Sequence, residues 1–230
     1  KQLEQVKPPI WNPPEVLRWN MNKLYLKELR ETGVPVIPSV FIPQGARVPL
    51  DSVMEEKNWE RVVVKPLIGA GGYKMSQIDR SEADSHQEDV QRLADERGVL
   101  IQPYLTSIEE NGEFSFVFFG GAYSYAVHKL PAKNEYLVHK DRGGHYEKTE
   151  PSDDLIRQAG ECLSNLTKQW LYLRLDAVQV EGRLKVVELE ALEPSFYFDT
   201  VPEGAEYFAE AIEQFIVEEE IPEPAIFSVE

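Results

Sequence analysis

Apolar and polar residues alternate between Leu173 and Ser195 in a pattern that predicts a β-hairpin. The two alternating runs flank Glu181-Gly182-Arg183, and Gly182 suits the left-handed backbone of a tight turn. A three-residue loop would pair Val180 with Leu184. The turn thereby fixes which side chains share a face, because successive side chains of a strand point to opposite sides.

In this register, Asp176 lies opposite Glu188, and Arg174 lies opposite Glu190. Carboxylates that face one another across a ladder repel, so a fold that gathers them normally supplies a cation. Oxygen donors on a stiff sheet face suit Mg²⁺, with Mn²⁺ as an alternative. The opposite, core-facing side would carry Leu173, Leu175, Val187 and Leu189.

A solvent-exposed charged face is the other interpretation of this hairpin, because surface strands often carry Asp and Glu. A two-residue turn would also exclude the metal site, since a shift of one residue sends Asp176 to the other face. The hairpin alone favours the exposed face, so the rest of the chain must decide.

The remaining periodicities predict an α+β fold with mostly antiparallel sheets. Helices are expected over residues 20–32, 50–57, 81–97, 152–168 and 207–216, and strands over 34–43, 61–66, 99–105 and 113–129. Four prolines within the first fourteen residues predict an extended arm. The acidic segment from Glu218 is expected to be a tail that lies on the surface or lacks fixed structure.

The composition limits the partners of this 230-residue chain. Its net charge of −16 excludes unaided binding to nucleic acid or an anionic membrane, because both require basic patches. The single cysteine, Cys162, excludes an internal disulfide and fits a reducing compartment such as the cytoplasm. A bound nucleotide would therefore need local lysines and metal ions.

The segment VVVKPLIGAGGYK, residues 62–74, places Lys65 at the end of a strand and a glycine-rich turn directly after it. The backbone N–H groups of such a turn, together with an ammonium group, suit phosphate oxygens. The segment is neither a Walker A loop nor a dinucleotide fingerprint, because the lysine precedes the glycines and a third spaced glycine is absent. For GAGG alone, a flexible hairpin tip is an equally good interpretation.

Six ordered pieces of the chain together resemble the ATP-grasp superfamily of ligases. They are Lys23 in the first helix, VVVKP with GAGG, QPYL at 102–105, GEFSFVFF at 112–119, RLD at 174–176 and ELE at 188–190. The early pieces are most similar to bacterial glutathione synthetase. The segment 186–198, VVELEALEPSFYF, is more similar to the cyclo-ligases that form D-cycloserine from O-ureido-serine.

This resemblance implies an ATP-grasp fold in which two α+β subdomains hold ATP between them. The implied division is an arm over residues 1–19, a small subdomain over 20–105, a large subdomain over 106–217 and a tail over 218–230.

The resemblance also implies roles for individual residues in binding the nucleotide. Lys23 and Lys65 would hold the α- and β-phosphates, and Glu113 would bind the ribose hydroxyls. The phosphate flap would contain Gly69, Gly71 and Gly72. The hinge that binds adenine would contain Gln102, Tyr104 and Leu105.

The reacting end of the site is implied in the same way. Lys129 would contact the terminal phosphates, and Arg174 would stabilise the developing oxyanion. Two Mg²⁺ ions would bind to Asp176, Glu188 and Glu190. The implied reaction phosphorylates a small amino-acid-like carboxylate to an acyl phosphate, which an amine or an internal nucleophile then attacks.

Leu137 and a missing front domain favour an alternative, a non-catalytic or regulatory ATP-binding module, and Glu190 is a further departure from the family pattern. Glu190 stands where many relatives have Asn, and Leu137 stands where they have an arginine. Only some twenty residues precede the first expected helix, where most relatives have a further α/β domain. That domain was removed, never existed, or is replaced by a partner subunit or a second copy in a dimer.

Overall fold

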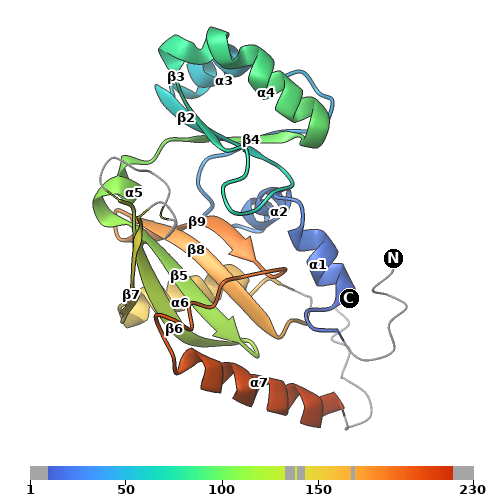
Figure 1. Ribbon diagram of the computed structural model, residues 1–230, viewed down its shortest axis with the longest axis vertical. Helices are drawn as coiled ribbons and strands as arrows, with labels where there is room; N and C mark the ends of the chain where they lie inside the picture. Colours follow the sequence, from blue (N-terminus) through green and yellow to red (C-terminus); the bar gives the residue numbers. More distant parts are fainter. Residues whose placement is uncertain (1–9, 133–137, 139–142, 167–168, 220–230) are drawn as a thin grey trace.

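The computed structural model describes residues 10–132, 138, 143–166 and 169–219, and these residues form two antiparallel sheets with helices around them. The four-stranded sheet lies above the five-stranded sheet in Figure 1. This arrangement confirms the predicted α+β class with mostly antiparallel strands.

The four-stranded sheet has the order β1-β4-β2-β3. Its strands are β1 (Val40–Ile42), β2 (Arg61–Pro66), β3 (Ser76–Asp79) and β4 (Val99–Pro103). α3 (Leu50–Lys57) and α4 (Ala83–Arg97) cover one face, and a short 3₁₀ turn (Arg80–Glu82) precedes α4. Val62 and Val64 point into this core, so the alternation of β2 turns Val63 and Lys65 toward the other sheet.

The five-stranded sheet has the order β7-β6-β5-β8-β9. Its strands are β5 (Glu113–Phe119), β6 (Ala122–Leu130), β7 (His145–Thr149), β8 (Tyr172–Val180) and β9 (Arg183–Glu190). α5 (Thr106–Asn111) connects β4 to β5, between the two sheets (Figure 1).

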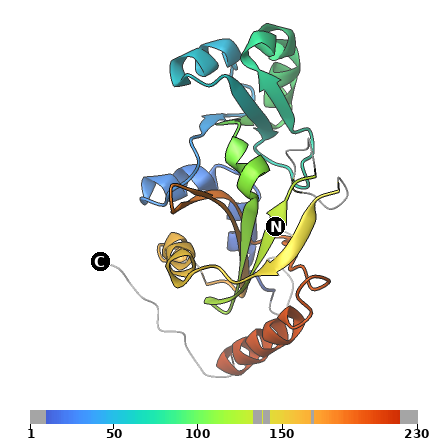
Figure 2. The same cartoon turned by 90° about the vertical axis from the view of Figure 1, so that its left-hand side faces the viewer.

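Helices cover both faces of the five-stranded sheet, as Figure 2 shows. One face packs against α1 (Pro14–Asn20), α2 (Tyr25–Glu31) and α6 (Asp153–Leu163), which Ser152 caps as its N-cap residue. On the other face, α7 (Gly204–Glu219) covers aromatic residues at one end. The remainder of that face is turned toward the four-stranded sheet and carries the charged residues described below.

The β8–β9 hairpin reaches the predicted pairing by an unpredicted route. The turn has two residues, Glu181 at φ 50° and Gly182 at φ 78°, and Val180 pairs with Arg183 rather than Leu184. A β-bulge then shifts the register, because Ala177 pairs with Val186 while Asp176 pairs with Glu188. The predicted three-residue loop is therefore wrong, but the bulge returns Asp176 and Glu188 to opposite positions on one face.

The extra residue of the bulge is Val187, which was predicted to face the core beside Leu189. It instead packs with Ile37 and Val178 and lines the cavity on the charged face. The physical reason is the bulge itself, which places two consecutive residues of β9 opposite one residue of β8. The other three predicted core residues, Leu173, Leu175 and Leu189, are buried as expected.

The predicted extended arm over residues 1–19 is wrong from Pro14 onward, because α1 begins there. Pro13 and Pro14 were expected to keep the chain extended. Proline at the first helical position instead favours a helix start, because its fixed φ fits and its missing N–H is not needed there. The helix predicted over 20–32 is shorter than expected: α2 covers Tyr25–Glu31, and residues 21–24 separate it from α1, which ends at Asn20.

α2 packs into the same apolar core as the five-stranded sheet, through Tyr25, Leu26 and Leu29. Leu67, which directly follows β2, and Leu100 of β4 belong to the same core, so the four-stranded sheet also contributes to it. The predicted division into subdomains at residue 105 stays a prediction. The shared core shows that α2 packs together with residues from both sheets.

Two asparagine side chains hold the chain before α2 to the end of the β8–β9 hairpin. Asn12, which is fully buried, donates to the carbonyls of Tyr172 and Ala191 at 2.8 Å each. Asn20 donates to the Leu189 carbonyl at 2.6 Å and accepts from the Ala191 N–H at 2.7 Å. These amides satisfy backbone groups that a further strand would otherwise bond.

None of the helices in the described part of the chain has the length and apolar character needed to cross a membrane.

Candidate active site

A cavity of about 740 Å³ lies between the two sheets. This size falls within the range of ligand sites and suits a nucleotide together with a small substrate. Its walls come from the glycine-rich loop, from β2, β5, β6, β8 and β9, and from residues 193–199. The cavity brings together the predicted site residues Lys23, Lys65, Gly69, Gly71, Gly72, Glu113, Lys129, Arg174, Asp176, Glu188 and Glu190.

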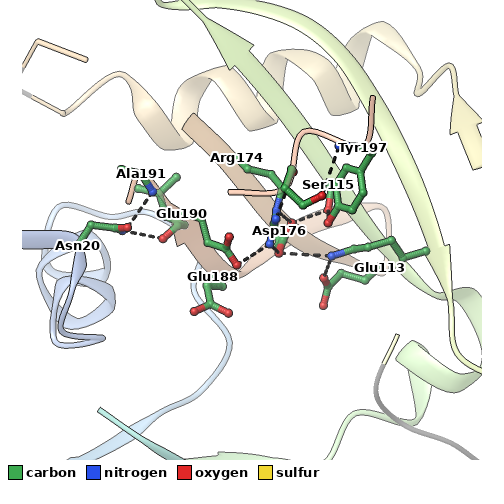
Figure 3. Close-up of polar contacts among 12 residues, drawn as sticks. Asn20, Glu113, Ser115, Arg174, Asp176, Glu188, Glu190, Ala191 and Tyr197 are labelled. Carbon is green, nitrogen blue, oxygen red and sulfur yellow. Dashed lines mark hydrogen bonds and ion pairs between the residues drawn. The ribbon is translucent and has the colours of Figure 1, made fainter. Parts of the chain in front are cut away.

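Asp176 lies at the centre of an ion-pair network on the five-stranded sheet (Figure 3). Arg174 donates to both of its carboxylate oxygens, at 3.0 and 2.8 Å, and to Glu190 at 2.5 Å. Lys129 lies 3.3 Å from Asp176 and forms a second, shorter pair with Glu113. The predicted catalytic cations and the predicted carboxylates are therefore in direct contact.

This network decides the charges of its members. Burial would raise the pKa of Asp176, but Arg174 and Lys129 outweigh it and hold that pKa well below its usual range. Burial would likewise lower the pKa of Lys129, yet the attraction of Asp176 and Glu113 raises it. The Asp176 carboxylate and the Lys129 ammonium therefore remain ionised at neutral pH.

Lys23 connects the glycine-rich loop to β9. Its ammonium lies 2.7 Å from Glu188 and donates to the Gly69 carbonyl at 2.7 Å. Lys23 and Lys65 together lower the pKa of Glu188 against the effect of burial. Lys65 has no ion pair with another described residue, and burial lowers the pKa of its ammonium.

Glu190 is the acidic residue that departs from the family pattern. Burial raises the pKa of its carboxyl to about 7, and the nearby Asp176 and Glu188 add to that effect while Arg174 opposes it. A second carboxyl, Glu113, also has a raised pKa because of burial. Perturbed pKa values gathered in one cavity are typical of functional sites.

The three predicted hinge residues do not line the cavity itself. Gln102 is almost fully buried and donates to Ser39 Oγ at 2.9 Å, while its Oε1 has no hydrogen-bond partner among the described residues. Its strand neighbour Val63 does line the cavity. An unpaired buried acceptor at this point fits the amino group of adenine, which is a donor.

The other two hinge residues point elsewhere. The Tyr104 hydroxyl donates to Glu109, and the guanidinium of Arg61 lies 5.0 Å from the Tyr104 ring centre. Leu105 packs in the apolar cluster around Ile37, Val178 and Val187. Their predicted contacts with adenine stay predictions.

The glycine-rich loop has the backbone freedom expected of a flap. Gly71 and Gly72 adopt positive φ values of 60° and 70°. A Cβ atom on Gly69 would lie 2.9 Å from Pro66 Cγ. Outside the loop, the Lys74–Glu96 pair and the bond from Arg97 to the Ile68 carbonyl tie its ends to α4.

The carboxylates have the donor atoms that Mg²⁺ prefers, and Asp176 and Glu188 lie side by side on one face. Among the described residues, however, no three acidic, histidine or cysteine side chains converge as a ready-made metal site. The oxygens are instead paired with Arg174 and Lys23. The donor chemistry therefore suits Mg²⁺, and in this structure the protein's own cations are the partners of these oxygens.

Sequence reasoning missed two residues of this site, Ser115 and Tyr197. Ser115 donates to Asp176 Oδ1 at 2.5 Å, and its hydroxyl lies 3.3 Å from that of Tyr197 (Figure 3). A signal for Ser115 was present, because the polar residues 113 and 115 alternate with phenylalanines in β5. Leu137, which stands where relatives have an arginine, and residues 139–142 lie outside the described residues.

Two antiparallel sheets enclose a cavity lined by a glycine-rich loop, lysines and the carboxylates of the β8–β9 hairpin, as in the ATP-grasp fold. A family model described as prokaryotic glutathione synthetase, ATP-grasp domain, matches residues 22–190, and the chain belongs to that family.

Related proteins support the same assignment. The cycloserine biosynthesis protein DcsG of Streptomyces lavendulae is 30% identical over 215 residues, covering 87% of this chain and 71% of that protein. The crystal structure of D-cycloserine synthetase DcsG has a TM-score of 0.78 at 28% identity, over 88% of this chain and 72% of that one. A D-alanine–D-alanine ligase from Bacillus anthracis, crystallised with ATP, shares the fold with a TM-score of 0.63 at 21% identity, over 86% and 65% of the two chains.

Proposed function

We propose that this protein is an ATP- and Mg²⁺-dependent ligase that activates a small amino-acid-like carboxylate. One observation supports this most directly: a single cavity unites Lys23, Lys65, Lys129 and Arg174 with the carboxylates of β8 and β9 beneath a glycine-rich flap. Phosphoryl transfer depends mostly on positioning and charge neutralisation, and these groups supply both.

In the proposed reaction, a substrate carboxylate oxygen attacks the γ-phosphorus of ATP, and ADP leaves. An amine nitrogen of a second substrate, or of the same molecule, then attacks the acyl carbon, loses a proton and displaces phosphate. Similarity to a cycloserine biosynthesis protein favours the second, ring-closing form.

Residues of the chain have distinct tasks in this proposal. Lys23 and Lys65 bind the inner phosphates, and Lys129 and Arg174 neutralise charge that develops on the transferred phosphoryl group and the acyl oxygen. Asp176, Glu188 and Glu190 would hold Mg²⁺, which would supply charge neutralisation to the phosphates. The flap would exclude water from the acyl phosphate. We also propose that the protein acts in the reducing cytoplasm, where the buried Cys162 would remain a thiol.

The charged groups of the cavity would change partners when a nucleotide binds. Lys23 and Lys129 now neutralise Glu188 and Asp176, and a nucleotide with its metal ions would exchange these partners. The lysines would turn to phosphates, and the carboxylates to the metal. Neither set of groups would be left buried without a counter-charge.

Titration calorimetry with ATP and Mg²⁺ tests this function. We expect binding that is lost in Lys65→Ala and Asp176→Asn, and retained in Lys57→Ala, which removes an exposed lysine of α3. ADP release stimulated by one of a panel of amino acids would then identify the carboxylate. Absence of ATP binding would contradict the proposal, and ATP binding without ADP formation with any acceptor would identify the non-catalytic module instead.

A further inference from the structure

Tyr197 lies beside the reacting end of the cavity and has an unusual backbone. Its φ is 55°, in the left-handed region that non-glycine residues rarely adopt. The N–H groups of Thr200 and Val201 both donate to its carbonyl at 2.8 Å, which holds it in this conformation. Strained positions of this kind are concentrated at functional sites.

Two cations lie over the ring of Tyr197. The Arg174 guanidinium carbon is 5.4 Å from the ring centre, and the Lys129 ammonium is 6.0 Å from it. The ring is buried and is supported edge-on by Tyr146 of β7, with 5.3 Å between centres. In a water-poor site, an aromatic face attracts such cations and limits where they rest.

The hydroxyl of Tyr197 completes a hydrogen-bond chain to Asp176. Ser115 has one proton, and it is directed to Asp176 Oδ1 at 2.5 Å, because the ionised carboxylate can only accept. The Tyr197 hydroxyl, 3.3 Å from Ser115 Oγ, is therefore the donor in that contact. One side chain thus contacts both cations and, through Ser115, the central carboxylate.

We propose that Tyr197 is a positioning residue, whose ring holds Arg174 and Lys129 where the terminal phosphates of ATP bind. The proposal rests on the function proposed above. It assigns to the aromatic segment after β9 a role in triphosphate recognition that is separate from the adenine end. Without the ring, Arg174 and Lys129 would keep their carboxylate partners but lose the aromatic face that limits where they rest.

The test replaces Tyr197 with phenylalanine and then with phenylalanines of increasing fluorination. These side chains keep the shape of the ring, so the fold is preserved, while each fluorine weakens its attraction for cations. We expect ATP affinity with Mg²⁺ to fall stepwise across the series by about threefold to thirtyfold, the range of such contacts. AMP affinity should not change, because AMP lacks the terminal phosphates.

The matched control is the same series at Phe208, which packs against Phe119 and Phe196 in the adjacent aromatic cluster. That series should leave the ratio of ATP to AMP affinity unchanged. A flat ATP response at position 197, or an equal loss of ATP and AMP, would overturn the positioning role while leaving ligase function intact. If the unmodified protein binds no ATP, the proposed function fails and this role fails with it.

Discussion

The two walls of the cavity differ in how their polar groups are partnered. On the five-stranded sheet, Asp176, Lys129 and Arg174 satisfy one another. On the four-stranded sheet, Lys65 has no ion pair with a described residue. Behind this wall, next to Val63 and outside the cavity lining, Gln102 Oε1 has no hydrogen-bond partner among the described residues. One wall is therefore neutralised internally, whereas the other carries groups whose partners would come with the ligand.

The difference predicts that one lysine of this cavity contributes to folding and another to binding. Removing one member of a buried ion pair leaves the other charge uncompensated. Substitutions in the five-stranded sheet should therefore lower the stability of the protein. Removing an unpaired buried group relieves a desolvation cost. Substitutions in the four-stranded sheet should therefore lower ligand affinity without lowering stability. The following substitutions test this contrast.

Lys129→Met should have the largest effect on stability. It leaves Glu113 and Asp176 without their shared cation, and we expect a loss of about 3–5 kcal/mol in the free energy of unfolding. Urea denaturation without nucleotide measures this loss. Lys148→Met is the matched control, because its pair with Glu203 is on the surface and should contribute little. A loss no larger than that of the control would show that the ion pairs of Lys129 do not stabilise the fold.

Lys65→Met should show the opposite behaviour. We expect the unfolding midpoint without nucleotide to stay constant or rise, because a buried ammonium with a lowered pKa is removed. ATP affinity should fall about tenfold to hundredfold, the value of a hydrogen bond to a charged group. Thermal unfolding and calorimetry on one preparation separate the two effects. A large loss of stability would show that other groups of the protein compensate the charge of Lys65.

Glu190→Gln should change how stability depends on pH. The pKa of Glu190 in the folded protein, about 7, lies above its ordinary value of 4.5, so the folded state binds this proton more tightly. Its contribution is fully present below pH 4.5 and is lost as pH rises through 7. Relative to the variant, the wild-type protein should lose about 2 kcal/mol between pH 5 and pH 8. Urea titrations in chelator measure this difference, and parallel pH profiles would refute it.

Gln102→Leu should have the smallest effect. The variant removes an unpaired buried acceptor together with one bond to Ser39, so stability without nucleotide should change little. ATP affinity should fall by about tenfold, a loss of about 1.4 kcal/mol, while weak GTP binding should not fall with it. Equal losses for both nucleotides would remove Gln102 from base recognition.

Much of the architecture was predictable because it depends on local patterns. Alternation located β2, β4, β5, β6, β8 and β9, and Ser152 marked the start of α6. The strand predicted over 34–43 is only β1, and β7 was not predicted. The hairpin register was predicted correctly at Asp176 for the wrong reason, because the short turn and the bulge at Val187 each shift it and cancel. Bulges have no clear sequence signal, since they depend on packing against neighbouring strands.

The partners within the site were less predictable than its membership. The resemblance to the ATP-grasp superfamily indicated that Lys23, Lys129 and Arg174 would reach the cavity. Which carboxylate each cation meets depends on contacts between strands far apart in sequence, such as β5 with β8. Tyr197 gave no signal at all, because its role depends on a left-handed backbone that its sequence does not indicate.

The amide contacts of Asn12 and Asn20 have a consequence for association between copies of the chain. β9 is the last strand of its sheet, and an uncovered strand edge recruits strands from other molecules. Asn20 occupies the backbone groups of Leu189 and Ala191, where such recruitment would begin. Shortening the chain past residue 20 would free the Leu189 carbonyl and the Ala191 N–H. The Leu189 N–H would keep its bond to the Tyr25 hydroxyl, and Val186 would keep its bonds to Pro35 and Ile37, so the newly uncovered edge would be confined to the end of β9.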